Sequence, residues 1–119
     1  MLIKFYLSDQ KAYFRLEEDL KMENAPVFYE NFIREVELFY GKQIFLDFSK
    51  LTFVDSSGIG SLLRISDFLK GRNSKLFIVG INKAMSAVFK LAGLYQIFNI
   101  IEKNELKNYL TKEELEKLY

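Results

Sequence analysis

The spacing of apolar residues changes along the chain and predicts which segments are strands and which are helices. Residues 2–7 (LIKFYL) and 11–16 (KAYFRL) alternate roughly between apolar and polar positions, and the turn-forming residues 8–10 separate them. This pattern predicts a β-hairpin. Residues 43–48 (QIFLDF) and 75–80 (KLFIVG) are short, continuous apolar runs. Such runs are typical of central strands that are covered on both faces.

Between these strands the apolar residues recur at helical spacing. The first predicted helix begins after Asn24, a good N-capping residue, and ends at Gly41. The second spans 56–70, and the third follows Asn82 and ends at Gly93. The apolar faces of the three helices are Phe28, Phe32, Val36 and Phe39; Ile59, Leu62, Leu63, Ile65, Phe68 and Leu69; and Met85, Val88, Phe89 and Ala92.

The end of the chain predicts one more strand and a helical segment. Residues 97–101 (IFNII) have strand length, and residues 104–119 have a helical pattern that fits one kinked helix or two. Thr111 and Glu114 stand at capping-box spacing within that segment. The element order is therefore β-β-α-β-α-β-α-β-α. We expect a single α/β domain over residues 1–119, with a mixed, mostly parallel sheet of about five strands and helices mainly on one face.

The composition excludes several classes of function. The 119-residue chain contains no cysteine and no histidine, which excludes disulfides, thiolate nucleophiles, Cys-based metal sites and Ser-His-Asp catalysis. We therefore expect no catalytic residue, no metal and no cofactor. The 17 Lys and Arg residues nearly balance the 16 Asp and Glu residues, for a net charge of +1. Because nucleic-acid-binding proteins usually carry a strong basic excess, we expect no direct contact with nucleic acid.

The distribution of charges also bears on location. No apolar run approaches the roughly 20 residues that span a bilayer. Lys4, Asp9 and Lys11 interrupt the N-terminal segment before the apolar core of a signal peptide can form. These features predict a cytoplasmic protein without a membrane span.

Polar residues concentrate at one junction, 51–60 (LTFVDSSGIG), which follows the strand 43–48 and opens the helix 56–70. Sites in open α/β sheets lie where strands end and helices begin, and a helix N-terminus favours anions. In the simplest interpretation, Asp55, Ser56 or Ser57 is only an N-cap, worth about 1 kcal/mol. The glycines would then serve close packing. The spacing of a phosphate-binding P-loop is absent, which disfavours a nucleotide-binding or hydrolytic enzyme.

Residues 44–63 (IFLDFSKLTFVDSSGIGSLL) resemble the signature of the STAS domain, named for sulphate transporters and anti-sigma factor antagonists. Within that superfamily they are most similar to bacterial anti-anti-sigma factors, whose mark is Asp-Ser-Ser-Gly-Leu-Gly after the third strand. A second block, residues 75–98 (KLFIVGINKAMSAVFKLAGLYQIF), is similar to the family's next strand, helix and link into the last strand.

The resemblance implies a switch and not an enzyme. Such proteins bind an anti-sigma factor with serine kinase activity and release the sigma factor that it held. The kinase phosphorylates the first serine after the aspartate, which here is Ser56, and a metal-dependent serine phosphatase removes the phosphate; Ser57 is the second choice. By the same resemblance, Gly58 and Gly60 let the kinase approach the backbone. The expected switch-loop and partner-binding residues are Asp55, Ser57, Gly58, Ile59, Gly60 and Lys21.

One segment departs from the family pattern. Family members usually carry Gly-x-Leu/Ile-Asp after the second strand, whereas here Glu18 and Lys21 stand at the glycine and aspartate positions. Asp19 is a candidate to replace that aspartate from a shifted place, and Lys21 is a candidate to pair with a phosphate on Ser56. The departure keeps an alternative function open: a STAS interaction module of another complex, such as a stress-signalling assembly or a lipid- or transporter-linked system.

The third predicted helix presents an alternative between core and surface. Met85 and Phe89, with Leu94, are expected to pack in the core. The alternative is an exposed apolar patch beside the junction, since partner-binding surfaces favour methionine and aromatic residues.

Overall fold

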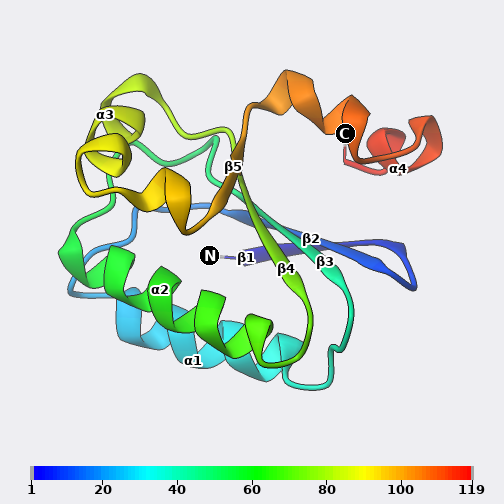
Figure 1. Cartoon of the computed structure of the whole chain (residues 1–119), viewed down its shortest axis with the longest axis horizontal. Helices are drawn as coiled ribbons and strands as arrows, with labels where there is room; N and C mark the ends of the chain where they lie inside the picture. Colours follow the sequence, from blue (N-terminus) through cyan, green and yellow to red (C-terminus); the bar gives the residue numbers. More distant parts are fainter. Residues whose placement is uncertain (1, 119) are drawn as a thin grey trace.

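The computed structural model describes residues 2–118 and contains one five-stranded sheet with the strand order β1-β2-β3-β4-β5 (Figure 1). The first two strands pair antiparallel as a hairpin, and every later strand lies parallel to its neighbour. This arrangement confirms the expected α/β fold with a mixed, mostly parallel sheet. The strands are β1 (Leu2–Ser8), β2 (Lys11–Leu16), β3 (Gln43–Asp47), β4 (Lys75–Val79) and β5 (Asn99–Ile101).

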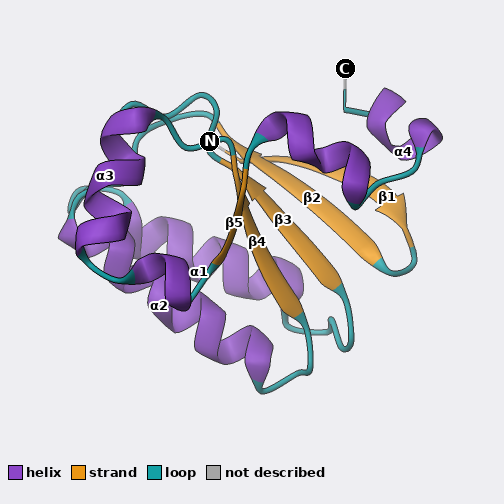
Figure 2. Cartoon of the chain, turned by 45° about the horizontal axis from the view of Figure 1, so that its top comes forward, coloured by secondary structure: helices purple, strands orange, loops and turns teal. Residues whose placement is uncertain are grey.

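Three helices cover one face of the sheet: α1 (Ala25–Val36), α2 (Ser56–Lys70) and α3 (Lys83–Leu91) (Figure 2). Alternate residues of each strand face them, such as Phe14 on β2 and Leu46 on β3, because successive side chains of a strand point to opposite faces. Phe28 and Phe32 of α1 are fully buried against this face. Each such side chain contributes about 1.5–3 kcal/mol by leaving water.

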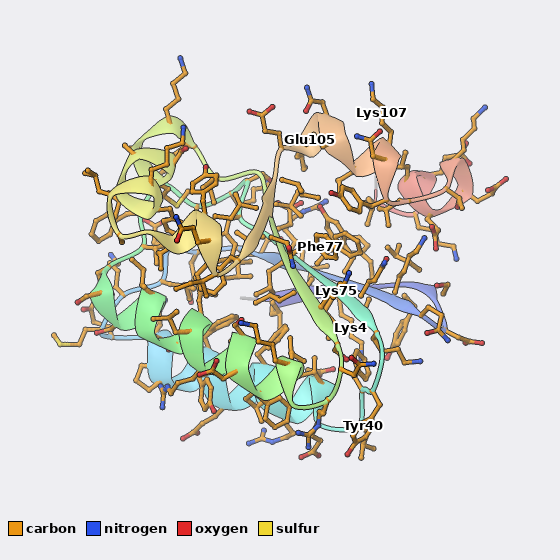
Figure 3. The ribbon with its side chains drawn as sticks, in the orientation of Figure 1. Lys4, Tyr40, Lys75, Phe77, Glu105 and Lys107 are labelled. Carbon is orange, nitrogen blue, oxygen red and sulfur yellow. The ribbon has the colours of Figure 1, made fainter. Side chains whose placement is uncertain are left out.

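The C-terminal segment covers the opposite face of the sheet (Figures 1 and 2). The rings of Phe45 and Phe77 stack there with centroids 4.8 Å apart, and the ring of Tyr109 lies 5.0 Å from that of Phe77. Leu106, Leu110 and Leu118 complete this second core. Figure 3 shows Phe77 on β4 beneath the segment, with Lys107 on the segment's outer side.

The C-terminal segment is not one kinked helix but two short pieces. A 3-10 helix (Lys103–Asn108) is followed by α4 (Lys112–Glu116). The capping box at the start of α4 is confirmed: the Thr111 hydroxyl accepts from the N–H of Glu114, and the Glu114 carboxylate accepts from the N–H of Thr111. The same carboxylate also binds the Lys11 ammonium of β2 at 2.9 Å, so it joins α4 to the sheet.

A buried carboxylate, Asp47, ties the end of β3 to this second face. One oxygen accepts from the Tyr13 hydroxyl at 2.5 Å and lies 3.5 Å from both the Arg15 guanidinium and the Lys103 ammonium. The other oxygen accepts from the N–H and the hydroxyl of Ser49. Burial raises the pKa of Asp47, but the hydrogen bonds from Ser49 and Tyr13 and the charge of Lys103 outweigh it, so the pKa lies below its ordinary value.

Several predicted boundaries need correction. Helix α1 ends at Val36, five residues before Gly41, and β5 begins at Asn99 instead of residue 97. Asn24 does not cap α1: its side chain accepts from the N–H of Lys21 and donates to the Asp19 carbonyl, so it closes the preceding loop.

In the part of the chain that the structure describes, residues 2–118, none of the helices combines the length and the apolar character that a membrane span requires.

Other predicted features are confirmed. Helix α2 spans residues 56–70 as predicted. Asn82 caps α3 by accepting from the N–H of Met85 at 2.8 Å. Gly93 follows the end of α3 with φ of 71°, the left-handed conformation that favours glycine after a helix.

We expect Asp47→Asn to lower the free energy of unfolding by on the order of 3 kcal/mol, because it leaves Arg15 and Lys103 beside a neutral amide. The folded pKa of Asp47 lies below the unfolded value of about 3.9. Its contribution is therefore fully present above that unfolded value and is lost as the pH falls through the folded pKa. Urea unfolding followed by circular dichroism, from neutral to acidic pH, measures both effects.

The matched control is Asp67→Asn, which changes an exposed carboxylate of α2. We expect this variant to keep wild-type stability at neutral pH. Equal stability of the two variants would contradict the anchoring role of Asp47.

Candidate functional site

The β3–α2 loop, residues 48–55, carries the chain from the carboxyl end of β3 to the first residue of α2, Ser56. Ser56 is exposed, whereas Ser57 is half-buried. Among residues 2–118, no partner hydrogen-bonds to the Ser56 hydroxyl. The structure therefore presents this hydroxyl to solvent at the start of the helix that packs beside α1.

Asp55 is the N-cap of α2, as one interpretation of the sequence predicted. One carboxylate oxygen accepts from the N–H of Gly58 at 3.0 Å. The other oxygen accepts at 2.9 Å from the N–H of Met22, a residue of the loop between β2 and α1. The hydrogen bond from Gly58 is the main reason that the pKa of Asp55 lies below its ordinary value. Desolvation opposes this effect, and the N–H groups of Met22 and Ser57 add to it.

Asp19 makes the reciprocal connection from the β2–α1 loop to the β3–α2 loop. One oxygen accepts from the N–H groups of Thr52 at 2.7 Å and Phe53 at 3.1 Å, and the other accepts from the Thr52 hydroxyl at 2.8 Å. Burial raises the pKa of Asp19, but these hydrogen bonds outweigh it and lower the pKa. Both oxygens of Asp19 thus hold the neighbouring loop.

A short backbone pairing lies between these two carboxylates. Leu20 forms an isolated parallel bridge with Val54, and the N–H of Asp55 donates to the Leu20 carbonyl at 3.0 Å. The two loops are therefore joined by side chains from both partners and by backbone. Nothing in the local sequence pattern indicated this contact, because its partners lie about thirty positions apart.

The two glycines of the motif have different surroundings. Gly58 is buried, and a Cβ placed on it would lie 2.7 Å from Val54 Cγ1 and 2.8 Å from Leu20 Cβ. Its missing side chain therefore lets α2 approach the paired loops. A Cβ on Gly60 would meet nothing within 4 Å. The structure thus accounts for Gly58 by internal packing and leaves Gly60 without a packing requirement.

The remaining predicted residues divide between surface and core. Lys21 is exposed and lies between Leu20, which pairs with Val54, and Met22, which donates to Asp55. Its positive charge favours the ionised forms of Asp19 and Asp55 and so contributes to their lowered pKa. Ile59 is half-buried against the helix-side core. The structure therefore brings Lys21 to the same loop pair as Asp55 and Ser56, although 35 positions separate it from Ser56 in the printed sequence.

An apolar groove of about 200 Å³ lies next to the β3–α2 loop, between it and α3. Met85 and Phe89, both buried as expected, line the groove together with the half-exposed side chains of Phe53 and Val88. The Asn82 side chain holds the start of α3 to the loop by donating to the Thr52 carbonyl at 3.3 Å. Sequence reasoning placed Val88 on the buried face of α3 and did not single out Phe53 for the site.

Residues 5–108 match the family model of the STAS domain, so the chain belongs to the STAS domain family. The match includes every strand from β2 to β5 and the helices α1 to α3. Residues 109–118, which contain α4, lie beyond it.

Three solved structures share the fold. A candidate anti-sigma factor antagonist from Thermotoga maritima is 23% identical, with a TM-score of 0.79 over 91% of this chain and 93% of that one. The anti-sigma factor antagonist SpoIIAA of Bacillus, unphosphorylated, is 16% identical, with a TM-score of 0.68 over 92% and 94%. The murine anion transporter Solute Carrier 26 family member A9 is 19% identical, with a TM-score of 0.69 over 77% of this chain and 16% of that one.

The two glycines allow a matched test of the site's packing. We expect Gly58→Ala to lower the free energy of unfolding by about 1–3 kcal/mol, because the added methyl group overlaps Val54 and Leu20. Gly60→Ala has open space and should raise it by up to about 1 kcal/mol, because alanine is the better helix former. Urea unfolding measures both variants. Equal effects of the two substitutions would contradict the packing role of Gly58.

Proposed function

We propose that this chain is an anti-sigma factor antagonist, which binds an anti-sigma factor and so releases a sigma factor, and that phosphorylation of Ser56 prevents the binding. The observation that carries this proposal is the exposed Ser56 hydroxyl, which has no hydrogen-bond partner among residues 2–118. It stands next to an N-cap, Asp55, that is held by two backbone N–H groups. The acceptor is therefore accessible while its surroundings are ordered.

The exposure of the two serines favours Ser56 over Ser57 as the phosphate acceptor. A kinase must place the acceptor hydroxyl against the γ-phosphate of ATP. The acceptor side chain must therefore project from the protein surface into solvent. Ser56 is exposed and Ser57 is half-buried. Ser57 remains the second choice.

The position also explains how a phosphate would act on binding and not on folding. A phosphate adds about −1.5 to −2 charge at pH 7. The N-terminus of α2 favours negative charge, so the fold tolerates the group. The same charge beside Asp55 would repel acidic groups of a partner and would have to be desolvated in a contact. The effect is local to the start of α2.

The apolar groove beside the loop supplies a contact surface of the kind that partner proteins use. Phe53 is 52% exposed and Val88 is 49% exposed, and they lie on the two walls of the groove. Aromatic side chains such as that of Phe53 are enriched in protein–protein interfaces. Thr52, Phe53 and Val54 belong to the loop that directly precedes Ser56, so the groove and the acceptor share the junction between β3 and α2.

The structural relatives support this proposal at the level of class. SpoIIAA is an anti-sigma factor antagonist, and the Thermotoga maritima protein is a candidate antagonist. The structure of SpoIIAA is known both unphosphorylated and phosphorylated. This chain matches the two forms with the same TM-score of 0.68. Under the proposal the partners are an anti-sigma factor with serine kinase activity and a metal-dependent serine phosphatase. The chain itself catalyses no reaction, contacts no nucleic acid and acts in the cytoplasm.

A second candidate function is that of a STAS module in another complex, such as a stress-signalling assembly or a transporter-linked system. The likeness to part of an anion transporter favours it, as does the presence of Glu18 and Lys21 at the two positions where antagonists usually carry glycine and aspartate. Binding of a kinase-type anti-sigma factor distinguishes the two candidates.

The switch is tested by comparing binding of the wild type, Ser56→Ala and Ser56→Asp to the anti-sigma factor. We expect Ser56→Ala to bind normally but to accept no phosphate from the kinase and ATP. Ser56→Asp should bind at least about tenfold more weakly, a loss of about 1.4 kcal/mol. Ser57→Ala is the matched control and should be phosphorylated normally. Phosphate on Ser56→Ala, or wild-type binding by Ser56→Asp, would refute the switch.

The contact surface is tested separately by Val88→Asp, which places a charge on the wall of the groove. We expect this variant to bind the anti-sigma factor at least about tenfold more weakly, because the partner would have to cover an unpaired carboxylate. Leu38→Asp is the control, since Leu38 is 82% exposed and follows the far end of α1. Isothermal titration calorimetry measures both. Equal affinity of the two variants would remove the groove from the proposed interface.

A further inference from the structure

Lys21 is a cation without a fixed partner at the proposed switch. Within residues 2–118, its ammonium makes no hydrogen bond and no ion pair. Its backbone is nevertheless held in place: its N–H donates to the Asn24 side chain at 2.8 Å, and its carbonyl accepts from the N–H groups of Asn24 and Ala25. An ammonium on an ordered backbone that no carboxylate holds at ion-pair distance is available to a new anion.

The backbone contacts bring the segment around Lys21 to the two residues that precede Ser56. The N–H of Met22, the next residue, donates to the Asp55 carboxylate at 2.9 Å, and Asp55 directly precedes Ser56. Leu20, on the other side of Lys21, pairs with Val54. Lys21 is thus flanked by two residues that contact the two residues in front of the acceptor serine.

Part of the first turn of α2 is already engaged with the Asp55 carboxylate. Asp55 already accepts from the N–H of Gly58, and the N–H of Ser57 also acts on its carboxyl. Asp19 and Asp55 add negative charge on the same side. A phosphate on Ser56 would therefore add negative charge beside two carboxylates, and Lys21 is a cation on the backbone segment that contacts Val54 and Asp55.

We propose that Lys21 binds the phosphate of phosphorylated Ser56 as a direct ion pair. This inference rests on the proposed function, because it concerns the phosphorylated state of that same site. The carboxylates of Asp19 and Asp55 already accept hydrogen bonds from backbone N–H groups. A phosphate on Ser56 is a dianion whose oxygens have no such donors. The Lys21 ammonium therefore binds the phosphate in preference to the carboxylates. The pair neutralises part of the added charge and removes Lys21 from contact with a partner.

The test uses the full chain with phosphoserine incorporated at position 56 during translation, so that it requires no kinase. Phosphorus NMR titration gives the affinity of the phosphate for its second proton, which has an ordinary pKa of about 6. Lys21→Gln should raise this proton affinity about two- to fivefold, because an exposed ammonium stabilises the dianion by that order. Lys21→Arg should keep the wild-type value, since arginine also carries a positive charge.

Lys50→Gln is the matched control, since Lys50 is an exposed lysine of the β3–α2 loop and lines the same open hollow as Lys21. We expect this variant to leave the proton affinity unchanged. An unchanged value in Lys21→Gln, or equal shifts in Lys21→Gln and Lys50→Gln, overturns the pairing. A failure of the anti-sigma factor to bind the unphosphorylated chain overturns the proposed function and leaves this titration interpretable.

Discussion

A sheet that is apolar on both faces must be covered on both, and the rest of the structure follows from this constraint. The helices α1, α2 and α3 cover one face and the C-terminal segment covers the other. Asp47 makes the second cover specific, because a fully buried carboxylate holds Tyr13, Arg15 and Lys103 at the end of β3. With both faces filled, the carboxyl edge of the sheet is where polar loops remain accessible.

At that edge two carboxylates perform reciprocal tasks. Asp19 of the β2–α1 loop accepts from the β3–α2 loop, and Asp55 of the β3–α2 loop accepts from the β2–α1 loop. Each carboxylate is an ionised acceptor of hydrogen bonds from backbone N–H groups. Hydrogen bonds with one ionised partner are among the stronger ones in proteins. The loops are thereby ordered before any partner arrives, so a partner loses less conformational entropy on binding. The exposed hydroxyl of Ser56 lies at the end of this ordered segment.

The residues that were predicted correctly are those whose partners lie close in sequence. Asn82 with Met85, Asp55 with Gly58, and Thr111 with Glu114 are all caps three positions apart. Asn24 looked equally suitable as a cap, but its side chain closes the preceding loop instead. The segment 104–119 has a helical pattern, yet packing on the sheet breaks it into a 3-10 helix and a short α-helix. Local propensity decides an element only where tertiary contacts agree with it.

By itself the sequence determined the order of the elements, the span of α2, the Asp-Ser-Ser motif at its start and the family to which that motif points. These follow from apolar periodicity and short-range capping, which act over a few residues. Only the tertiary structure decided that Gly58 is required for packing, that Asp19 holds Thr52, and that the backbone next to Lys21 holds Asp55. Those contacts join two loops more than thirty positions apart, and the register of β2 against β3 brings them together.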